Sequence, residues 1–289
     1  MRTIAITGAS GFVGTRLNKY FSNLGYKIIP IAREVLNNQE KLDEIINSSD
    51  VIINLAGANI INRWTPAYKE LLYTSRIDTT KKIVDALNKI EDKNKLLIST
   101  SAVGIYDNRE TYDEKGNYAN EFLSNLCQDW EKEALKAKSK NVKVSIFRFG
   151  IVLGKDGGAF SKMITPFRFG LGGIIGSGNQ AFSYIHIEDL LNAYKYVIEN
   201  NLQDTFNLTA PKPTTNLFFT RALGKALRRP TIFPVPEFVL KLIFSEGAKV
   251  LTDGQDAIPK RLQDLGFKFK YNNIEETLKS LVWIIKGEK

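Results

Sequence analysis

The residues with the clearest chemical signature are three glycines near the start of the chain. In ITGASGFVGTRL, the glycines Gly8, Gly11 and Gly14 directly follow a short β run and open a helical pattern. This spacing lets the backbone approach a pyrophosphate, whose charge is attracted to the free N–H groups of a helix N-terminus. The segment predicts a dinucleotide-binding turn, with a ligand-free βα turn as the alternative. The expected contacts are Gly8, Ser10, Gly11, Phe12, Val13 and Gly14.

The residue after the second predicted strand bears on which dinucleotide binds. Folds that prefer NAD place an acidic residue there, about 20 residues beyond the glycines, to bind the ribose hydroxyls. Here Arg33 comes first after the strand, and Glu34 follows one step later. A guanidinium can form charge-assisted hydrogen bonds to a 2′-phosphate, so NADP(H) is expected rather than NAD. A solvated surface arginine is the alternative.

The end of the third predicted strand adds further candidate contacts. It reads Asn54-Leu55-Ala56-Gly57, and small residues there let the chain pass close to an adenosine ribose and a pyrophosphate. By itself the tetrapeptide is ambiguous, because it also fits a simple strand end. We expect Leu55, Ala56 and Gly57 to contact the cofactor.

The elements that must position these residues alternate along the first half of the chain. Strands are predicted for the apolar runs at 3–7, 27–32, 51–57, 95–100 and 142–148. Helical periodicity separates them, with one helix expected near 120–138. Near-continuous apolar strands alternating with helices are typical of a parallel sheet covered on both faces. The expected fold class is α/β, a Rossmann-type doubly wound parallel sheet.

The second half of the chain has a different pattern, with glycine-rich loops and shorter elements punctuated by prolines. Helical periodicity returns at 215–227, 236–244 and 274–285. We therefore expect an NADP-binding Rossmann domain over residues 1–153 and a smaller, mostly helical substrate-side lobe over 154–289. Part of 179–200 is expected to return to the Rossmann half.

Composition excludes several classes of function. The 289 residues are 43% hydrophobic and 25% charged, as in ordinary globular proteins. The formal charge is +9, but the lysines are scattered and no nucleic-acid motif is present, so no nucleic-acid partner is expected. One cysteine and one histidine argue against a disulfide framework and a metal site, and favour a reducing, cytoplasmic location. Neither a secretory segment nor an apolar stretch of ~20 residues is found, so no membrane partner is expected.

Several phrases carry a resemblance to a known family. TGASGFVG, NLAG and STSAVGIY together resemble an extended short-chain dehydrogenase/reductase of the NAD-dependent epimerase/dehydratase superfamily. RWTPAYKELLYTSRIDTT (63–80) and FSYIHIEDL (182–190) are similar to its SulA-like subgroup of "epimerase family proteins", which has its own C-terminal domain. The resemblance covers nearly the whole chain. It implies a Rossmann-type sheet, an NADP-type cofactor and a substrate lobe, and it leaves the small-molecule substrate unnamed.

The resemblance also implies two further cofactor contacts. Arg76 is expected to open a helix beside the third strand and reach a phosphate or ribose, with a salt bridge as the alternative. Val152 would line the nicotinamide side, with an ordinary core position as the alternative. Members of the superfamily often dimerise through helices of the Rossmann half, so a homodimer is an open expectation.

The catalytic residues of this superfamily are only partly present. Most members use a serine or threonine with a Y-x-x-x-K helix, in which the lysine lowers the tyrosine pKa and the tyrosine transfers a proton. Ser101 fits the serine, with a strand-end serine bonded to backbone as the alternative. Aligning the commonly following glutamate with Glu131 places Leu123 and Cys127 where the tyrosine and lysine are needed. Cys127 supplies no positive charge, and we expect it to be a small apolar core residue.

Two other residues are candidates for the proton transfer. Tyr106 closes STSAVGIY and could face the same cleft as Ser101. His186, the only histidine, lies where extended members bring the second lobe back to the cleft. A neutral imidazole both donates and accepts a proton near pH 7. A structural role is the alternative for both residues.

Two functions follow as hypotheses. The first is an NADP(H)-dependent oxidoreductase or epimerase-like enzyme, in which Ser101 with Tyr106 or a water polarises a carbonyl. The second is a non-catalytic NADP(H)-binding redox sensor or scaffold, which the missing tyrosine–lysine pair favours. Against the second, the segment GLGGIIGSGNQAFSYIHI still resembles the lining of an intact cleft.

Overall fold

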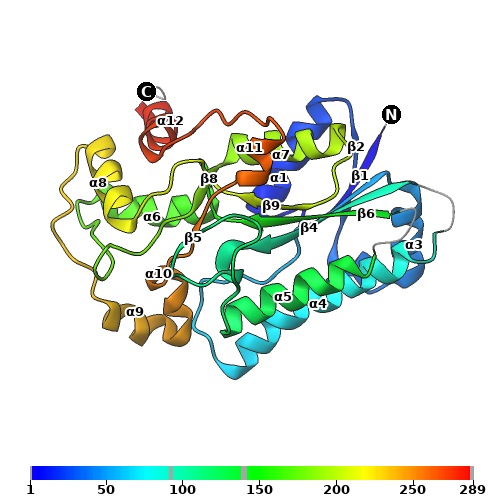
Figure 1. Ribbon diagram of the computed structural model, residues 1–289, viewed down its shortest axis with the longest axis horizontal. Helices are drawn as coiled ribbons and strands as arrows, with labels where there is room; N and C mark the ends of the chain where they lie inside the picture. Colours follow the sequence, from blue (N-terminus) through cyan, green and yellow to red (C-terminus); the bar gives the residue numbers. More distant parts are fainter. Residues whose placement is uncertain (1, 91–93, 138–141, 287–289) are drawn as a thin grey trace.

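A six-stranded parallel sheet forms the centre of the computed structural model, which describes residues 2–90, 94–137 and 142–286. Its strand order is β2-β1-β3-β4-β6-β9 (Figure 1). The strands are β1 (Thr3–Thr7), β2 (Lys27–Ile31), β3 (Val51–Asn54), β4 (Lys95–Ala102), β6 (Val142–Phe149) and β9 (Thr205–Leu208). Every neighbouring pair runs parallel, which confirms the expected Rossmann-type α/β class.

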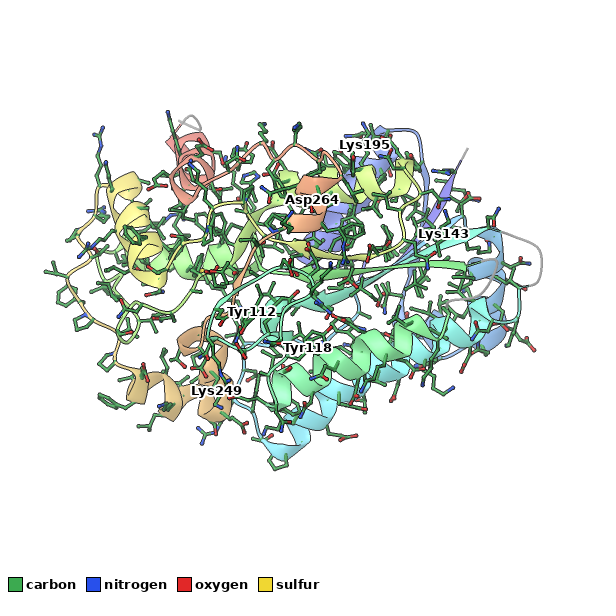
Figure 2. All side chains as sticks on the ribbon, in the orientation of Figure 1. Tyr112, Tyr118, Lys143, Lys195, Lys249 and Asp264 are labelled. Carbon is green, nitrogen blue, oxygen red and sulfur yellow. The ribbon has the colours of Figure 1, made fainter. Side chains whose placement is uncertain are left out.

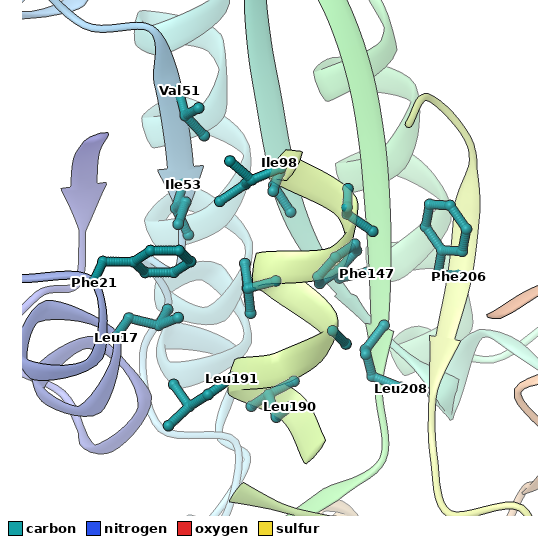
Figure 3. Close-up of a cluster of buried hydrophobic side chains, with 14 of the residues drawn as sticks. Leu17, Phe21, Val51, Ile53, Ile98, Phe147, Leu190, Leu191, Phe206 and Leu208 are labelled. Carbon is teal, nitrogen blue, oxygen red and sulfur yellow. The ribbon is translucent and has the colours of Figure 1, made fainter. Parts of the chain in front are cut away.

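Helices cover both faces of the sheet, because successive strand side chains point to opposite sides. In β1, Ile4 and Ile6 pack toward α1 (Phe12–Asn23) and α7 (Ile187–Glu199), whereas Ala5 packs toward the other face. The other face carries α3 (Gln39–Ser48), α4 (Pro66–Leu87) and α5 (Phe122–Leu135). Figure 3 shows the first core, where Leu17 and Phe21 of α1 and Leu190 and Leu191 of α7 meet the sheet.

The second half of the chain contributes to this sheet. Strand β9 pairs with β6 in parallel, so the return to the Rossmann half continues past residue 200, where the sequence had placed its end, to Leu208. Two small sheets join the halves further. They pair β7 (Ile151–Leu153) with β8 (Tyr184–His186), and β5 (Thr111–Tyr112) with β10 (Asp256–Ala257).

The remaining helices lie mostly after β7. They are α6 (Gly158–Arg168), α8 (Asn216–Leu227), α9 (Glu237–Phe244), α10 (Lys249–Thr252), α11 (Lys260–Asp264) and α12 (Ile274–Lys286), with α2 (Arg33–Leu36) earlier and the short 3₁₀ turns η1 (Val103–Ile105) and η2 (Ser245–Ala248). Figure 1 places α6, α8 and α12 together at one end, where they enclose an apolar cluster that includes Phe160, Phe219 and Leu278. No helix in the described ranges is long and apolar enough to cross a membrane.

The N-caps show at which helix starts the free backbone N–H groups already have a side-chain hydrogen-bond partner. Thr65 caps α4 by accepting a hydrogen bond from the Tyr68 N–H, and Thr215 caps α8 in the same way. Helix α1 differs, because its N-cap is Gly11 and it has neither a side-chain cap nor an acidic residue in its first turn. Its first N–H groups are therefore available to an anion.

Candidate functional site

The glycine turn between β1 and α1 is a cradle that no other residue type would fit. Gly8 has a φ of +63°, and the Gly11 N–H donates to its carbonyl at 3.0 Å. A Cβ on Gly14 would lie 2.3 Å from the Gly8 carbonyl oxygen, so a side chain there would force α1 away from the turn. The turn keeps its backbone open at the N-terminus of α1, which fits a dinucleotide pyrophosphate.

A buried hydrogen-bond chain fixes the ends of β1 and β3 around this cradle. The Thr7 hydroxyl donates to Asn54 Oδ1 at 2.7 Å and accepts from the N–H groups of Leu55 and Ala56 at 3.0 and 3.2 Å. Asn54 Nδ2 in turn donates to the Thr80 hydroxyl at 2.8 Å. Thr7 and Thr80 were not expected from the sequence. For Thr7 the usable signal was a polar residue at the end of an otherwise apolar strand, whereas Thr80 lies within α4.

A cleft of about 480 Å³ opens at the carboxyl edge of the sheet. Its lining includes these residues expected from the sequence: Gly8, Gly11, Phe12, Val13, Gly14, Leu55, Gly57, Arg76, Ser101 and Val152. Among the described residues, Ser10, Arg33 and Ala56 lie outside the lining. Arg33 is exposed at the start of α2, directly after β2, which leaves its guanidinium free to turn toward a ligand at the rim.

Arg76 reaches the cleft from a different position than expected. It lies in the middle of α4, not at its start, so the prediction that it opens a helix was wrong. Its guanidinium donates to the carbonyls of Leu72 and Ala58, each at 3.0 Å, and lies 5.3 Å from the centre of the Trp130 ring. A Cβ on Gly57 would lie 3.0 Å from Arg76 Cζ, so the glycine makes room for the guanidinium.

Ser101 provides a hydroxyl with an open hydrogen-bonding position. It ends β4 with its side chain toward the cleft and is 1% exposed. Within the described part of the chain, no nitrogen or oxygen atom pairs with its Oγ, and the Cys127 thiol is its polar neighbour. A buried polar group without a partner carries a free-energy penalty and is typical of a site where a ligand completes the hydrogen bond.

Helix α5 places two apolar residues beside Ser101. Leu123 and Cys127 both line the cleft, one helical turn apart, so they occupy the face where a tyrosine and a lysine would act. A Cβ on Gly104 would lie 2.6 Å from Leu123 Cδ2, which shows how closely the leucine approaches the end of β4. Burial raises the pKa of the Cys127 thiol to about 12, so it stays protonated near neutral pH.

Tyr106 lies outside the lining of this cleft and instead lines a neighbouring cavity of about 610 Å³. Its side chain is fully buried, its hydroxyl donates to Asn207 Oδ1 at 2.8 Å, and the Arg148 guanidinium donates to it at 2.7 Å. Burial, against the opposing effect of Arg148, raises the pKa of Tyr106 to about 12. Its ring stacks on that of Tyr112 with ring centres 5.6 Å apart and lies 6.4 Å from that of Tyr118; Figure 2 labels both of these tyrosines. The hydroxyl of Tyr106 is thus held by Arg148 and Asn207.

The partner of Tyr106, Arg148, belongs to a buried ion pair that the sequence analysis missed. Its Nε and Nη2 donate to the two Glu131 carboxylate oxygens at 2.8 and 2.7 Å. The pair joins α5 to β6, and Arg148 also donates to the Tyr118 hydroxyl at 2.7 Å. An arginine inside the apolar run VKVSIFRF was the signal for it, because a buried charge needs a partner.

His186 also lies outside the cleft lining and caps α7. Its Nδ1 accepts from the Glu188 N–H at 3.1 Å, so in the neutral ring the proton is on Nε2, which lies 3.1 Å from the Ser280 hydroxyl. The ring is 3% exposed and lies 3.8 Å from the Tyr271 ring centre. Burial lowers the pKa of His186 to about 4, so the imidazole is neutral near pH 7.

Comparison with known families covers most of the chain. Residues 4–209 match the model of the NAD dependent epimerase/dehydratase family, and residues 235–281 match a domain of unknown function, DUF1731.

Individual relatives extend over the same length. The epimerase family protein SDR39U1 homolog, chloroplastic, of Arabidopsis thaliana is 36% identical over 97% of this chain and 86% of its own. The crystal structure of human epimerase family protein SDR39U1 with NADPH has a TM-score of 0.90 at 31% identity, covering 97% of this chain and 99% of that one. A nucleoside-diphosphate sugar epimerase from Corynebacterium glutamicum has a TM-score of 0.78 at 25% identity, covering 99% of this chain and 60% of that one.

Proposed function

Because the chain belongs to the NAD-dependent epimerase/dehydratase family, we propose that it is an NADP(H)-dependent oxidoreductase or epimerase-like enzyme acting on a small molecule. The observation that carries the proposal is that the glycine cradle and the unpartnered hydroxyl of Ser101 open into one cleft. Membership of this family supports a nicotinamide dinucleotide as the cofactor. The buried cysteine suits the reducing cytoplasm, which we propose as the location.

The residues present fit NADP(H). The uncapped N-terminus of α1 would hold the pyrophosphate, and the cradle of Gly8, Gly11 and Gly14 would let it approach the backbone. Arg33 would pair with the 2′-phosphate through charge-assisted hydrogen bonds. The human relative crystallised with NADPH supports the choice of the phosphorylated dinucleotide.

The chain's own chemical contribution centres on Ser101. When bound, NADPH supplies a hydride for a carbonyl carbon. The Ser101 hydroxyl would donate a hydrogen bond to the carbonyl oxygen and so stabilise the negative charge that develops there. Leu123 carries no transferable proton, and proton transfer from Cys127 would leave a thiolate that burial disfavours. The proton that completes the alcohol would therefore come from a water in the cleft.

A second candidate function is a non-catalytic NADP(H)-binding redox sensor or scaffold. The specific observation in its favour is that Leu123 and Cys127 lie on the cleft face of α5, where a proton-transferring pair would be needed. Under this alternative, cofactor binding would be retained while loss of the Ser101 hydroxyl would leave the biological activity unchanged.

The first experiment is a titration with NADPH, NADP⁺ and NADH, followed by cofactor fluorescence and thermal shift. Arg33→Glu should weaken NADPH binding roughly tenfold or more, because a hydrogen bond to a charged group contributes about 1.5–3 kcal/mol. The affinity for NADH, which lacks the 2′-phosphate, should change much less. Arg221→Glu, on the exposed face of α8, is the matched control and should leave both affinities unchanged. Absence of binding to all three dinucleotides would rule out both candidate functions.

A further inference from the structure

A second, smaller compartment lies beside the cofactor cleft and shares part of its wall. It has a volume of about 180 Å³, and it is enclosed by α6, the segment 171–175, the start of α8 and residues 250–254. The two cavities share wall residues that include Ile151, Met163, Val250, Leu251 and Asp253. The shared wall places the compartment directly next to the cleft that Ser101 lines.

The compartment presents an apolar surface. Phe182 and Phe219 stack in its wall with ring centres 4.2 Å apart. Two of its polar side chains hydrogen-bond to the backbone around it: Asn216 Oδ1 accepts from the Ile175 N–H at 2.9 Å, and Gln180 Nε2 donates to the Ile175 carbonyl at 3.0 Å. The Thr220 hydroxyl and the Asp253 carboxylate are the other polar side-chain groups in the lining that the structure describes, and the rest is mostly apolar, so the space favours an apolar group.

Beyond the glycine cradle, the charges around the cavities do not suit a second diphosphate in addition to that of the cofactor. Among the described residues that line the two compartments, Arg76 is the one cation and Asp253 the one carboxylate. A third cavity, of about 610 Å³, adjoins the cleft and contains two more cations, each with an acidic neighbour. Arg109 lies 3.8 Å from the Asp107 carboxylate and Lys249 lies 2.9 Å from that of Glu121. A phosphate group would meet carboxylates there rather than unpaired cations.

The wall of the compartment that faces solvent is also apolar. The segment 171–176 is held against 233–235 by hydrogen bonds between Val235 N–H and the Ile174 carbonyl at 2.8 Å, and between Gly176 N–H and the Val235 carbonyl at 3.0 Å. Leu171 lines the compartment while 61% exposed, and Phe233 is 51% exposed on the paired segment. An apolar ligand would thus meet apolar side chains at the mouth and inside.

We infer that this compartment is the substrate subsite of the proposed enzyme and takes an uncharged aryl or alicyclic group of a substrate without phosphate. The inference rests on the proposed function, because it assumes that the reacting oxygen of that substrate reaches Ser101. Its size supports a ring: a cavity of about 150 Å³ lined by apolar side chains is sufficient to bind benzene. The substrate class therefore differs from the nucleoside-diphosphate sugars.

The test is saturation-transfer NMR on the full chain with saturating NADP⁺, using acetophenone, cyclohexanone and UDP-glucose as probes. Saturating NADP⁺ keeps UDP-glucose out of the glycine cradle. Both ketones should receive saturation from the protein, and UDP-glucose should not. Val235 lines this compartment and neither of the other two cavities, so Val235→Phe should narrow only the compartment and abolish the ketone signals. Val239→Phe, a similarly half-buried valine outside the three cavities, should preserve them.

A second variant keeps the test valid if Val235→Phe fails to fold. Leu171→Asp changes an exposed wall residue, and it should also suppress the ketone signals because it places a charge at the mouth. Ketones that fail to bind, ketone signals that survive both substitutions, or UDP-glucose binding beside NADP⁺ would each overturn the inference. NADPH titration of the same samples separates the two proposals. Intact NADPH binding without ketone binding refutes the subsite alone, whereas absent NADPH binding refutes both.

Discussion

The hydroxyl of Ser101, to which we assign a proposed chemical role, also has a cost in stability. It is buried without a nitrogen or oxygen partner in the described residues, and such a group costs about 1–3 kcal/mol. We expect Ser101→Ala to leave the free energy of unfolding unchanged or to raise it by about 1 kcal/mol, while NADPH affinity is retained and turnover of any ketone substrate is lost. Urea unfolding and NADPH titration measure the first two quantities.

A serine on the neighbouring strand is the matched control. Ser145 of β6 is equally buried, but its hydroxyl donates to the Leu202 carbonyl at 2.8 Å. Ser145→Ala should therefore lower the free energy of unfolding by about 1–3 kcal/mol. The same sign of change in both variants would show that the two hydroxyls do not differ as the structure describes.

The imidazole of His186 predicts a pH dependence of stability. Its pKa is lowered by burial to about 4 in the folded chain, against 6.5 for the free side chain. Between these values the unfolded state binds more protons, so stability is complete above pH 6.5 and is lost as the pH falls toward 4. The expected loss is on the order of 3 kcal/mol.

The measurement compares wild type with His186→Asn in urea at pH 7.5, 5.5 and 4. Asparagine retains a cap acceptor for the Glu188 N–H but does not titrate. The difference between the two curves isolates the histidine from the carboxylates, which titrate in both proteins. A constant difference at all three pH values would contradict a neutral, buried His186.

Some residue roles could not be predicted because their partners are distant in the sequence. Tyr106 was a candidate for the cleft, but its hydroxyl partners are Arg148 and Asn207, 42 and 101 residues away. His186 likewise contacts Ser280 from the last helix. The glycine turn was predictable because its constraints are local: Gly14 packs against the backbone of Gly8, which is close to it in the sequence.

At the scale of elements, α5 joins the cleft to a buried ion pair. Cys127 faces the cleft, and Glu131, one turn later, binds Arg148 of β6. The two charged side chains are 9% and 2% exposed. Removing one partner of such a pair leaves an uncompensated buried charge, so Arg148→Met should lower the free energy of unfolding by about 3–5 kcal/mol.

An exposed pair provides the comparison for this prediction. Lys81 and Asp85 form an i,i+4 pair on α4 with side chains 60% and 49% exposed. Lys81→Met should change stability by less than about 0.5 kcal/mol, because solvent screens the interaction. Restoring stability by pairing Arg148→Met with Glu131→Leu would show that the penalty comes from the stranded carboxylate. If Arg148→Met and Lys81→Met changed the free energy of unfolding equally, a special cost of the stranded buried charge would be excluded.

Element types were predictable wherever apolar periodicity was long. The strands of the main sheet in the first half of the chain and the helices α5, α8, α9 and α12 lie where periodicity predicted them. The start of α4 was not recognised, although Thr65 followed by Pro66 is a typical helix start. That omission led to the wrong position for Arg76. Strand β9 is only four residues long, and its place beside β6 depends on tertiary packing.

The whole molecule depends on the second half of the chain to close its main core. Leu190, Tyr194 and Phe206 are fully buried in the cluster that also contains α1 and β1. Burial of each such side chain contributes about 1.5–3 kcal/mol, against a total stability of about 5–15 kcal/mol for a domain. Residues 1–153 expressed alone should therefore lack a cooperative thermal transition and show poor amide dispersion in NMR spectra.

Residues 1–209 are the matched control for this truncation. They retain α7 and β9 and lose fewer core side chains, such as Leu262 and Phe267. We expect a cooperative transition at a lower temperature than that of the full chain. A cooperative melt of 1–153 would instead establish the Rossmann half as an independent domain, as the sequence boundary proposed.

Because Cys127 is buried, the alkylation of its thiol can be used to measure opening motions of α5. Its thiol is 2% exposed and protonated at neutral pH, so a maleimide reagent reacts only after the helix separates from the end of β4. No other cysteine in the sequence competes for the reagent. The alkylation rate therefore reports the fraction of molecules in which the cleft wall is open, and a molecule that occupies the cleft should slow the reaction.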